Sequence, residues 1–151
     1  MALEIERKFL VKDQTYRDSF IERHHLTQGY LSLDPEHTVR IRISDDTAWI
    51  TVKSRNHGAV RNEWEYPIPV SDAREMLSLC GDAVLSKWRY VVEYGEHRWE
   101  IDEYEGRLAP LLVAEVEMDS EDCSPAIPPF IGKEVTGDAR YYNSALVASL
   151  Y

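Results

Sequence analysis

The first charged residues of the chain alternate so that acids and a base fall side by side. Glu4, Glu6 and Lys8 are separated by Ile5 and Arg7. Successive side chains of an extended strand point to opposite faces, so these three charged side chains share one face. A charged strand face usually meets solvent. The same set can also bind a divalent cation through its carboxylates and a phosphate through its ammonium.

Charged residues recur on one face of most of the later strand-like segments. The cations on these faces are Lys8, Arg40, Arg42, Lys53, Lys87 and Arg89, with Arg61 added by its place in the alternation. The anions are Glu4, Glu6, Glu63, Glu65, Glu100, Asp102, Glu115 and Glu117. Charges screened from water are costly unless counter-charges or ligands match them. Two interpretations stay open: a self-neutralising set of ion pairs, or a site for a polyanion and a divalent cation.

Eight segments have the alternation expected of strands, joined mostly by short turns. They are residues 3–12, 24–33, 38–44, 47–54, 61–68, 84–94, 97–105 and 111–118. Helices are predicted at 13–23, at 72–80 between Ser71 and Gly81, and after Asp138, with Leu150 on the buried face of the last one. Residues 119–130 are predicted to form a loop, and 132–138 to lead into the last helix.

This pattern predicts a mainly β protein with flanking helices, of the α+β class. A single open sheet would leave long unpaired edges, and its apolar face would need more cover than three modest helices supply. Closing the sheet removes the edges. We therefore predict a closed eight-stranded antiparallel barrel, a tunnel whose lumen is polar and charged and whose outside is apolar.

Composition narrows the class of protein further. The 151 residues suffice for one domain, predicted to span 1–151, and the net charge of −10 argues against a general nucleic-acid binder. No apolar run approaches the roughly 20 residues of a membrane helix, and the start of the chain does not resemble a signal peptide. Two cysteines without metal-ligand spacing predict a cytoplasmic protein without a disulfide framework.

Six cations suit a short chain of phosphates, and the clustered carboxylates suit Mg²⁺ or Mn²⁺. Other catalytic motifs are missing from the sequence: it contains no GxxxxGK[ST] phosphate loop, no HExxH and no GxSxG. Positioning and charge stabilisation by metal and cations are the main requirements for cleaving a P–O–P bond.

The charged motifs together resemble the CYTH superfamily, the triphosphate tunnel metalloenzymes. Glu4-Ile5-Glu6-Arg7-Lys8 is similar to the family's ExExK signature. The likeness continues in order through Arg40-Ile41-Arg42, Lys53, Glu63-Trp64-Glu65, Lys87-Trp88-Arg89, Glu100-Ile101-Asp102, Glu115-Val116-Glu117 and Gly132-Lys133-Glu134-Val135-Thr136. Among the family's members, the chain looks most similar to the small bacterial inorganic triphosphatases.

The resemblance implies an eight-stranded tunnel that binds a triphosphate with Mg²⁺ or Mn²⁺, closed at one end by the last helix. It implies phosphate binding by Lys8, Arg40, Arg42, Lys53, Lys87, Arg89 and Lys133. It implies metal coordination by Glu4, Glu6, Glu115 and Glu117, with Glu63, Glu65 and Asp102 as further candidates. The implied catalytic residues are Glu4, Glu6, Lys8 and Lys87.

The implied reaction is hydrolysis of inorganic tripolyphosphate to pyrophosphate and phosphate. Three alternatives stay open: a class IV-type adenylyl cyclase, a nucleoside or thiamine triphosphatase, and a non-catalytic polyphosphate-binding module. A small-molecule triphosphate is the expected partner, without nucleic acid or membrane. The apolar outer face also makes a homodimer plausible.

Overall fold

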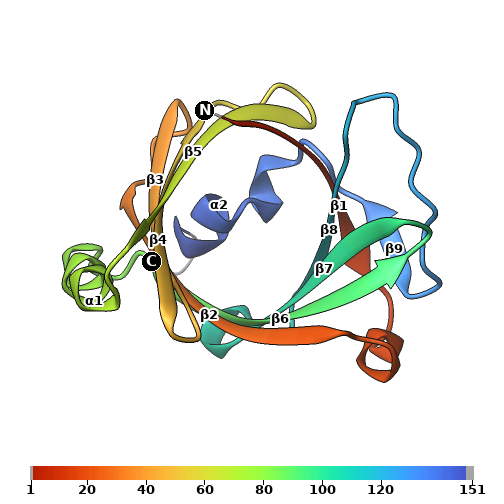
Figure 1. Ribbon diagram of the computed structural model, residues 1–151, viewed down its shortest axis with the longest axis horizontal. Helices are drawn as coiled ribbons and strands as arrows, with labels where there is room; N and C mark the ends of the chain where they lie inside the picture. Colours follow the sequence, from red (N-terminus) through yellow and green to blue (C-terminus); the bar gives the residue numbers. More distant parts are fainter. Residues whose placement is uncertain (1, 149–151) are drawn as a thin grey trace.

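The computed structural model describes residues 2–148, and strands dominate it (Figure 1). Its elements are β1 (Ala2–Val11), η1 (Thr15–Asp18), β2 (Glu22–Ser32), β3 (His37–Ser44), β4 (Thr47–Ser54), β5 (Val60–Ile68), α1 (Val70–Leu79), β6 (Val84–Tyr94), β7 (His97–Tyr104), η2 (Gly106–Leu108), β8 (Leu112–Glu117), β9 (Ile131–Glu134), η3 (Ala139–Tyr141) and α2 (Asn143–Ala148), where η marks a 3₁₀ helix.

Eight of the strands close into an antiparallel barrel. The sheet runs β5-β4-β3-β2-β6-β7-β8-β1-β9, and a further pairing between β5 and β1 completes the ring. Figure 1 looks into this ring, with α1 outside it and α2 within its outline. The closed antiparallel barrel predicted from the alternation is therefore confirmed.

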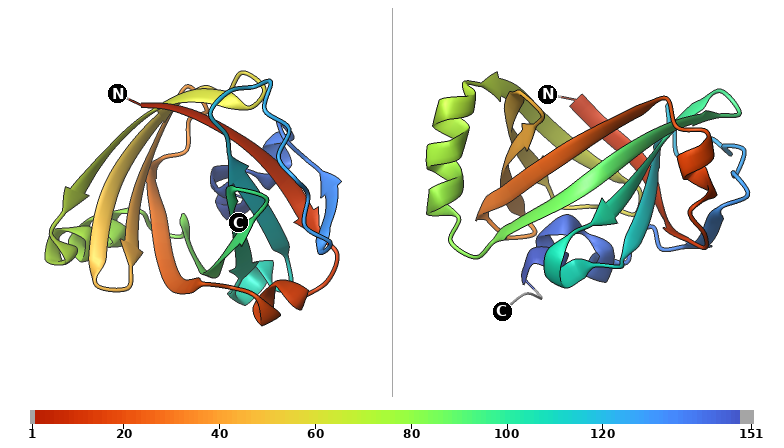
Figure 2. Two further views of the ribbon diagram at one scale, coloured as in Figure 1. Left: turned by 45° about the vertical axis from the view of Figure 1, so that its right-hand side comes forward. Right: turned by 90° about the horizontal axis from the view of Figure 1, so that it is seen from below.

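Strand β1 is the seam of the barrel, because it pairs with three other strands. Its residues 2–5 pair with β5, residues 6–10 pair with β8, and Phe9 and Val11 pair with β9. The left view of Figure 2 shows β1 in red along the barrel wall, with β9 in blue beside its far end. Strand β9 was not predicted, since its four residues were read as part of a connection.

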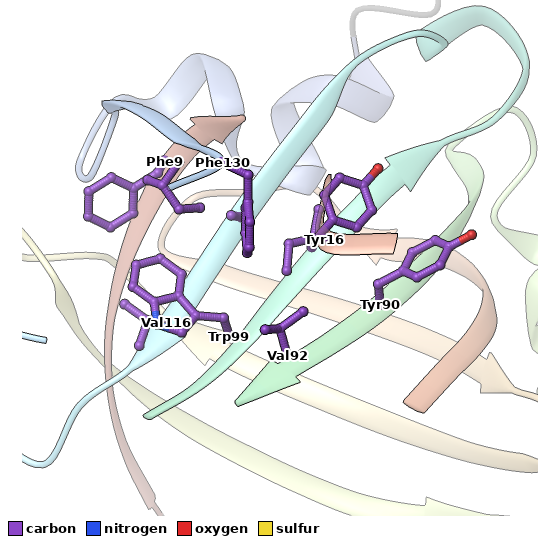
Figure 3. Close-up of a cluster of buried hydrophobic side chains, with 10 residues drawn as sticks. Phe9, Tyr16, Tyr90, Val92, Trp99, Val116 and Phe130 are labelled. Carbon is purple, nitrogen blue, oxygen red and sulfur yellow. The ribbon is translucent and has the colours of Figure 1, made fainter. Parts of the chain in front are cut away.

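An aromatic cluster covers the outside of the barrel over β1, β6, β7 and β8 (Figure 3). Trp99 is fully buried and lies 5.4 Å from Phe9, measured between ring centroids. Tyr16 from η1 packs edge-on against both Tyr90 and Phe130. The outward apolar residues predicted from strand alternation are thus covered by η1, by the end of loop 119–130 and by β9.

Helix α1 covers a second outer face, over β2, β3 and β4. It packs closely because β2 has a glycine under it: a Cβ on Gly29 would lie 2.9 Å from Cys80 Sγ. The helix begins after Pro69, and not after Ser71 as predicted, since Ala73 N–H donates to Pro69 O at 3.0 Å. It ends before Gly81, as predicted, and Gly81 has a φ of 59°.

One end of the lumen is apolar, although most of the lumen is polar and charged, as predicted. Leu146 and Val147 of α2 pack there against Tyr30, Leu85 and Val113 of the barrel wall. The same strands therefore present apolar residues inward at one end and charged residues further along. Helix α2 fills the apolar end.

Two predicted helices differ from the observed ones. Asp13 does accept hydrogen bonds from Thr15, but the helix predicted at 13–23 is only η1, because Ile21 N–H already donates to Val91 O at 2.8 Å and β2 begins at Glu22. Asp138 caps η3, and α2 begins only at Asn143. Leu150 lies outside the described residues. No helix within residues 2–148 is long and apolar enough to cross a membrane.

Candidate active site

The charged part of the lumen is a cavity of about 220 Å³. Fourteen residues line it, from seven strands of the barrel and from α2. They are Glu4, Glu6, Lys8, Arg40, Arg42, Lys53, Arg61, Glu63, Glu65, Arg89, Glu100, Glu115, Glu117 and Asn143. The lining thus has six cations and seven carboxylates around one space.

The strand register explains which of these charges are neighbours. Lys8 lies opposite Glu115 on β8, and Glu6 lies opposite Glu117. Lys53 lies opposite Glu63 on the neighbouring strand. Side chains directly across an antiparallel pair are close enough to interact, so strand pairing converts separate sequence motifs into one cluster.

Glu4 is the acid most fully matched by cations. Its carboxylate lies 3.1 Å from Lys53 Nζ and 3.3 Å from Arg61 Nε. Burial would raise the pKa of Glu4, but Lys53, a hydrogen bond with Glu63 and Arg61 lower it to about 2. Burial and the same hydrogen bond raise the pKa of Glu63 to about 7. Glu4 is therefore ionised, and its hydrogen bond with Glu63 favours the protonated form of Glu63.

Glu6 is an acid that the surrounding cations do not neutralise. Burial raises its pKa, and the neighbouring carboxylates of Glu115 and Glu4 raise it further, to about 8. Burial and Glu4 also raise the pKa of Glu117. Glu115 keeps its charge because Lys8 Nζ lies 3.4 Å away. This side of the cavity accordingly has more carboxylate groups than cations to neutralise them.

The opposite side of the cavity has an excess of positive charge. Burial and the guanidinium groups of Arg40 and Arg89 lower the pKa of Arg42 to about 9. Arg42 Nε donates to Gln28 Oε1, whereas the buried Nε of Arg40 has no hydrogen-bond partner within residues 2–148. Clustered cations, together with a buried N–H group that lacks an acceptor, favour the binding of a polyanion.

A buried ion network lies beneath this basic side. Lys87 and Asp102 are fully buried, with Lys87 Nζ 2.6 Å from Asp102 Oδ2. Arg89 also binds Asp102 through two nitrogens, at 2.7 and 2.9 Å. Burial would raise the pKa of Asp102, but Arg89 and Lys87 lower it to about 2. Burial, together with the nearby charges of Arg89 and Arg42, lowers the pKa of Lys87 to about 7, although Asp102 raises it.

Most of the residues predicted for the site line the cavity, and three do not. Lys87 and Asp102 are fully buried and do not line the open space. Lys133 is exposed on β9, apart from the cavity, so its placement gives no support to the predicted phosphate contact. Asn143 lines the cavity and was not predicted. Nothing in the strand alternation pointed to it, because it lies in α2.

The fold and the cavity together define an antiparallel β-tunnel with opposed basic and acidic sides. The CYTH domain model matches residues 2–143, and this chain belongs to the CYTH domain family. An inorganic triphosphatase of Acetivibrio thermocellus is 41% identical over 152 residues, which cover 100% of this chain and 97% of the relative. An inorganic triphosphatase of Nitrosomonas europaea is 36% identical over 97% of this chain and 98% of the relative.

A solved structure has the same architecture. The crystal structure of an inorganic triphosphatase superposes with a TM-score of 0.71 at 34% identity, covering 97% of this chain and 95% of that one. The resemblance inferred from the charged motifs is therefore confirmed at the level of family and fold.

Proposed function

We propose that this chain is a divalent-metal-dependent hydrolase of the terminal phosphoanhydride of a triphosphate. Its substrate would be inorganic tripolyphosphate, cleaved to pyrophosphate and phosphate. The observation that carries the proposal is one cavity in which the arginines of the basic side, Arg40, Arg42 and Arg89, face an acidic side where the protein does not neutralise Glu6. The names of the two full-length relatives, both inorganic triphosphatases, support the same reaction.

The composition of the cavity wall supports an inorganic substrate. Among the described residues that line the charged cavity, none is aliphatic and none is aromatic. Small-molecule sites that hold organic groups are mostly apolar, with only a few polar contacts. A thiamine or nucleoside group would find no ring on which to stack inside this space, whereas phosphate oxygens would find cations on several sides.

The residues proposed to hold the phosphates are Lys8, Arg40, Arg42, Lys53 and Arg89. The arginines come from β3 and β6, and the lysines from β1 and β4. Placing them around one chain of phosphates fixes the substrate and stabilises the charge that develops on its oxygens. Lys87 supports this side from beneath, through its contacts with Asp102 and Asn143.

The donor chemistry of the cavity fits a hard divalent cation. Within residues 2–148 no three His, Cys, Asp or Glu side chains are preassembled as a metal cluster. Mg²⁺ does not need such a cluster, because it keeps several waters and takes one or two carboxylates plus substrate phosphates. Glu4, Glu6, Glu115 and Glu117 are the proposed ligands, and Glu63 and Glu65 belong to the wider acidic set. Asp102, also predicted as a ligand, is instead bound by Lys87 and Arg89 outside the cavity lining. When bound, the cation supplies charge neutralisation and an activated water.

We propose Glu4, Glu6 and Lys8 as catalytic residues, and either Mg²⁺ or Mn²⁺ as the cation. The test is phosphate release from tripolyphosphate with each metal. Glu4→Ala and Glu6→Ala should abolish release, whereas Glu75→Ala, on the exposed face of α1, should leave it intact. No turnover of any triphosphate with either metal would refute the proposal.

The same assay separates the alternatives. An adenylyl cyclase would convert ATP to cyclic AMP and pyrophosphate. A binding module would be stabilised by tripolyphosphate without turnover, since a ligand that binds only the folded state raises stability. The cytoplasmic location and the homodimer remain predictions, and the oligomeric state is measurable by light scattering.

A further inference from the structure

Asn143 lies where α2 meets the charged cavity, a position that the alternation of the strands did not predict. It is the first residue of α2, the helix that fills the apolar end of the lumen, and it also borders the charged cavity. Its side chain therefore lies where the helix, the barrel wall and the proposed substrate space meet. Nothing in the proposed function so far requires a neutral amide at this position.

Two donors from the barrel wall fix the orientation of this amide. Lys87 Nζ donates to Asn143 Oδ1 at 3.1 Å, and the Tyr104 hydroxyl donates to the same oxygen. A lysine ammonium can only donate, so the amide oxygen must face Lys87. Flipping the amide would set its NH₂ group against the Lys87 ammonium, whose charged form the adjacent Asp102 carboxylate favours. The hydrogen-bond partners of the side chain therefore determine which way the amide points.

The amide nitrogen of Asn143 consequently points away from Lys87 and Tyr104. Nδ2 carries two N–H donors, and no residue between 2 and 148 accepts a hydrogen bond from it. Asn143 borders both the charged cavity and a small enclosed space next to it, which Arg40, Lys53 and Arg61 also border. Asn143 accordingly lies beside Arg40 and Lys53, two of the cations that are proposed to hold phosphate.

The geometry points to Asn143 as a substrate-contacting residue, whose side-chain NH₂ donates to a phosphate oxygen of the bound triphosphate. Lys87 and Tyr104 act as positioning residues, because they hold the amide oxygen and leave the nitrogen free. A bound phosphate chain thereby links the barrel wall to α2. This inference rests on the proposed function, since it takes the triphosphate as the ligand.

Two substitutions test the contact. Asn143→Ala removes the donor, and we expect KM for tripolyphosphate to rise about 10-fold, as for a lost hydrogen bond to a charged group. Asn143→Asp keeps an acceptor oxygen for Lys87 and Tyr104, but it places an anion against the phosphates. We expect a larger rise in KM, about 100-fold. The matched control is Asn62→Asp, the same change on β5 at a residue outside the cavity lining.

Two readouts distinguish a substrate contact from a purely structural role. KM and kcat are measured with tripolyphosphate and Mg²⁺, and the shift in melting temperature is measured with tripolyphosphate alone. Support requires that both Asn143 variants raise KM and lose most of the melting shift, while Asn62→Asp keeps wild-type values. Because Asn143→Asp retains the wall contacts, its melting temperature without ligand should stay close to that of the wild type.

The outcomes separate the two proposals. If the wild type hydrolyses tripolyphosphate and both Asn143 variants keep KM within twofold of the wild type, the contact is wrong and the proposed function stands. A fall in the ligand-free melting temperature with unchanged KM would likewise assign Asn143 a structural role only. If the wild type neither hydrolyses tripolyphosphate nor is stabilised by it, both proposals are overturned.

Discussion

Replacing Glu6 by Gln should stabilise the metal-free protein, and the gain should depend on pH. The folded state keeps the Glu6 proton up to a pKa of about 8, against an ordinary value of 4.5. Wild-type stability therefore falls as the pH rises from about 4.5 to about 8, because the unfolded chain releases this proton more readily. Glutamine cannot ionise, and its amide can still donate to Glu115.

The size of the effect follows from the same pKa. Each pKa unit corresponds to about 1.4 kcal/mol, so the free energy of unfolding of Glu6→Gln should exceed the wild-type value by at most about 5 kcal/mol at pH 8. Water in the cavity screens the charge and will reduce this limit. At pH 4.5 and below, the two proteins should be nearly equal. The free energies are measured by urea denaturation with a chelator present.

The experiment includes a control variant and a second measurement with added metal. Glu75→Gln makes the same chemical change on the exposed face of α1 and should show no growing gain in stability between pH 4.5 and 8. Adding Mg²⁺ or Mn²⁺ should stabilise the wild type more than Glu6→Gln, since the cation favours the ionised carboxylate. A stability difference that stays constant from pH 4.5 to 8 would refute the reasoning.

Three further changes probe the barrel away from Glu6. Gly29→Ala should lower the free energy of unfolding by about 1–3 kcal/mol, because the added methyl group meets Cys80; an unchanged urea midpoint would contradict this. Asp45→Asn should lower the pKa of His24, which a hydrogen bond to Asp45 raises, as an NMR titration of the ring can check. The stability advantage of the wild type over Asp45→Asn should be full between about pH 4 and 6.5, where Asp45 is ionised and His24 protonated, and shrink as the pH rises through the pKa of His24. Lys133→Ala should leave KM for tripolyphosphate within twofold of the wild type, whereas a tenfold rise would restore this exposed lysine to the site.

The strands and the charged cavity were predictable because both depend on a period of two. Alternation placed Glu4, Glu6 and Lys8 on one face, and it also placed Arg61 and Glu100 in the lumen without help from the family motifs. Barrel closure followed from the need to satisfy strand edges. These features depend on local sequence and on general rules of sheet packing.

The remaining features depend on contacts between distant segments. The four residues of β9 form a strand because the far end of β1 offers them a partner. Lys87 and Asp102 point toward the inside of the barrel, as the alternation predicts. Their full burial depends on contacts with α2 and with the Arg89 side chain, which the strand alternation does not reveal. Asn143 was missed for the same reason, since its role depends on Lys87 and Tyr104 meeting one amide oxygen.

The threefold pairing of β1 affects how the protein can be made. The first strand to leave the ribosome finds its neighbours only after Glu63, Glu117 and Glu134 have been synthesised. Such distant pairings make folding slow, because long loops must close before any contact is gained. A nascent chain that stops before β8 contains Glu4 and Glu6 but lacks Glu115 and Glu117, which lie beside Glu6 in the closed barrel. The affinity for a cation should therefore arise late, with the closing of the ring.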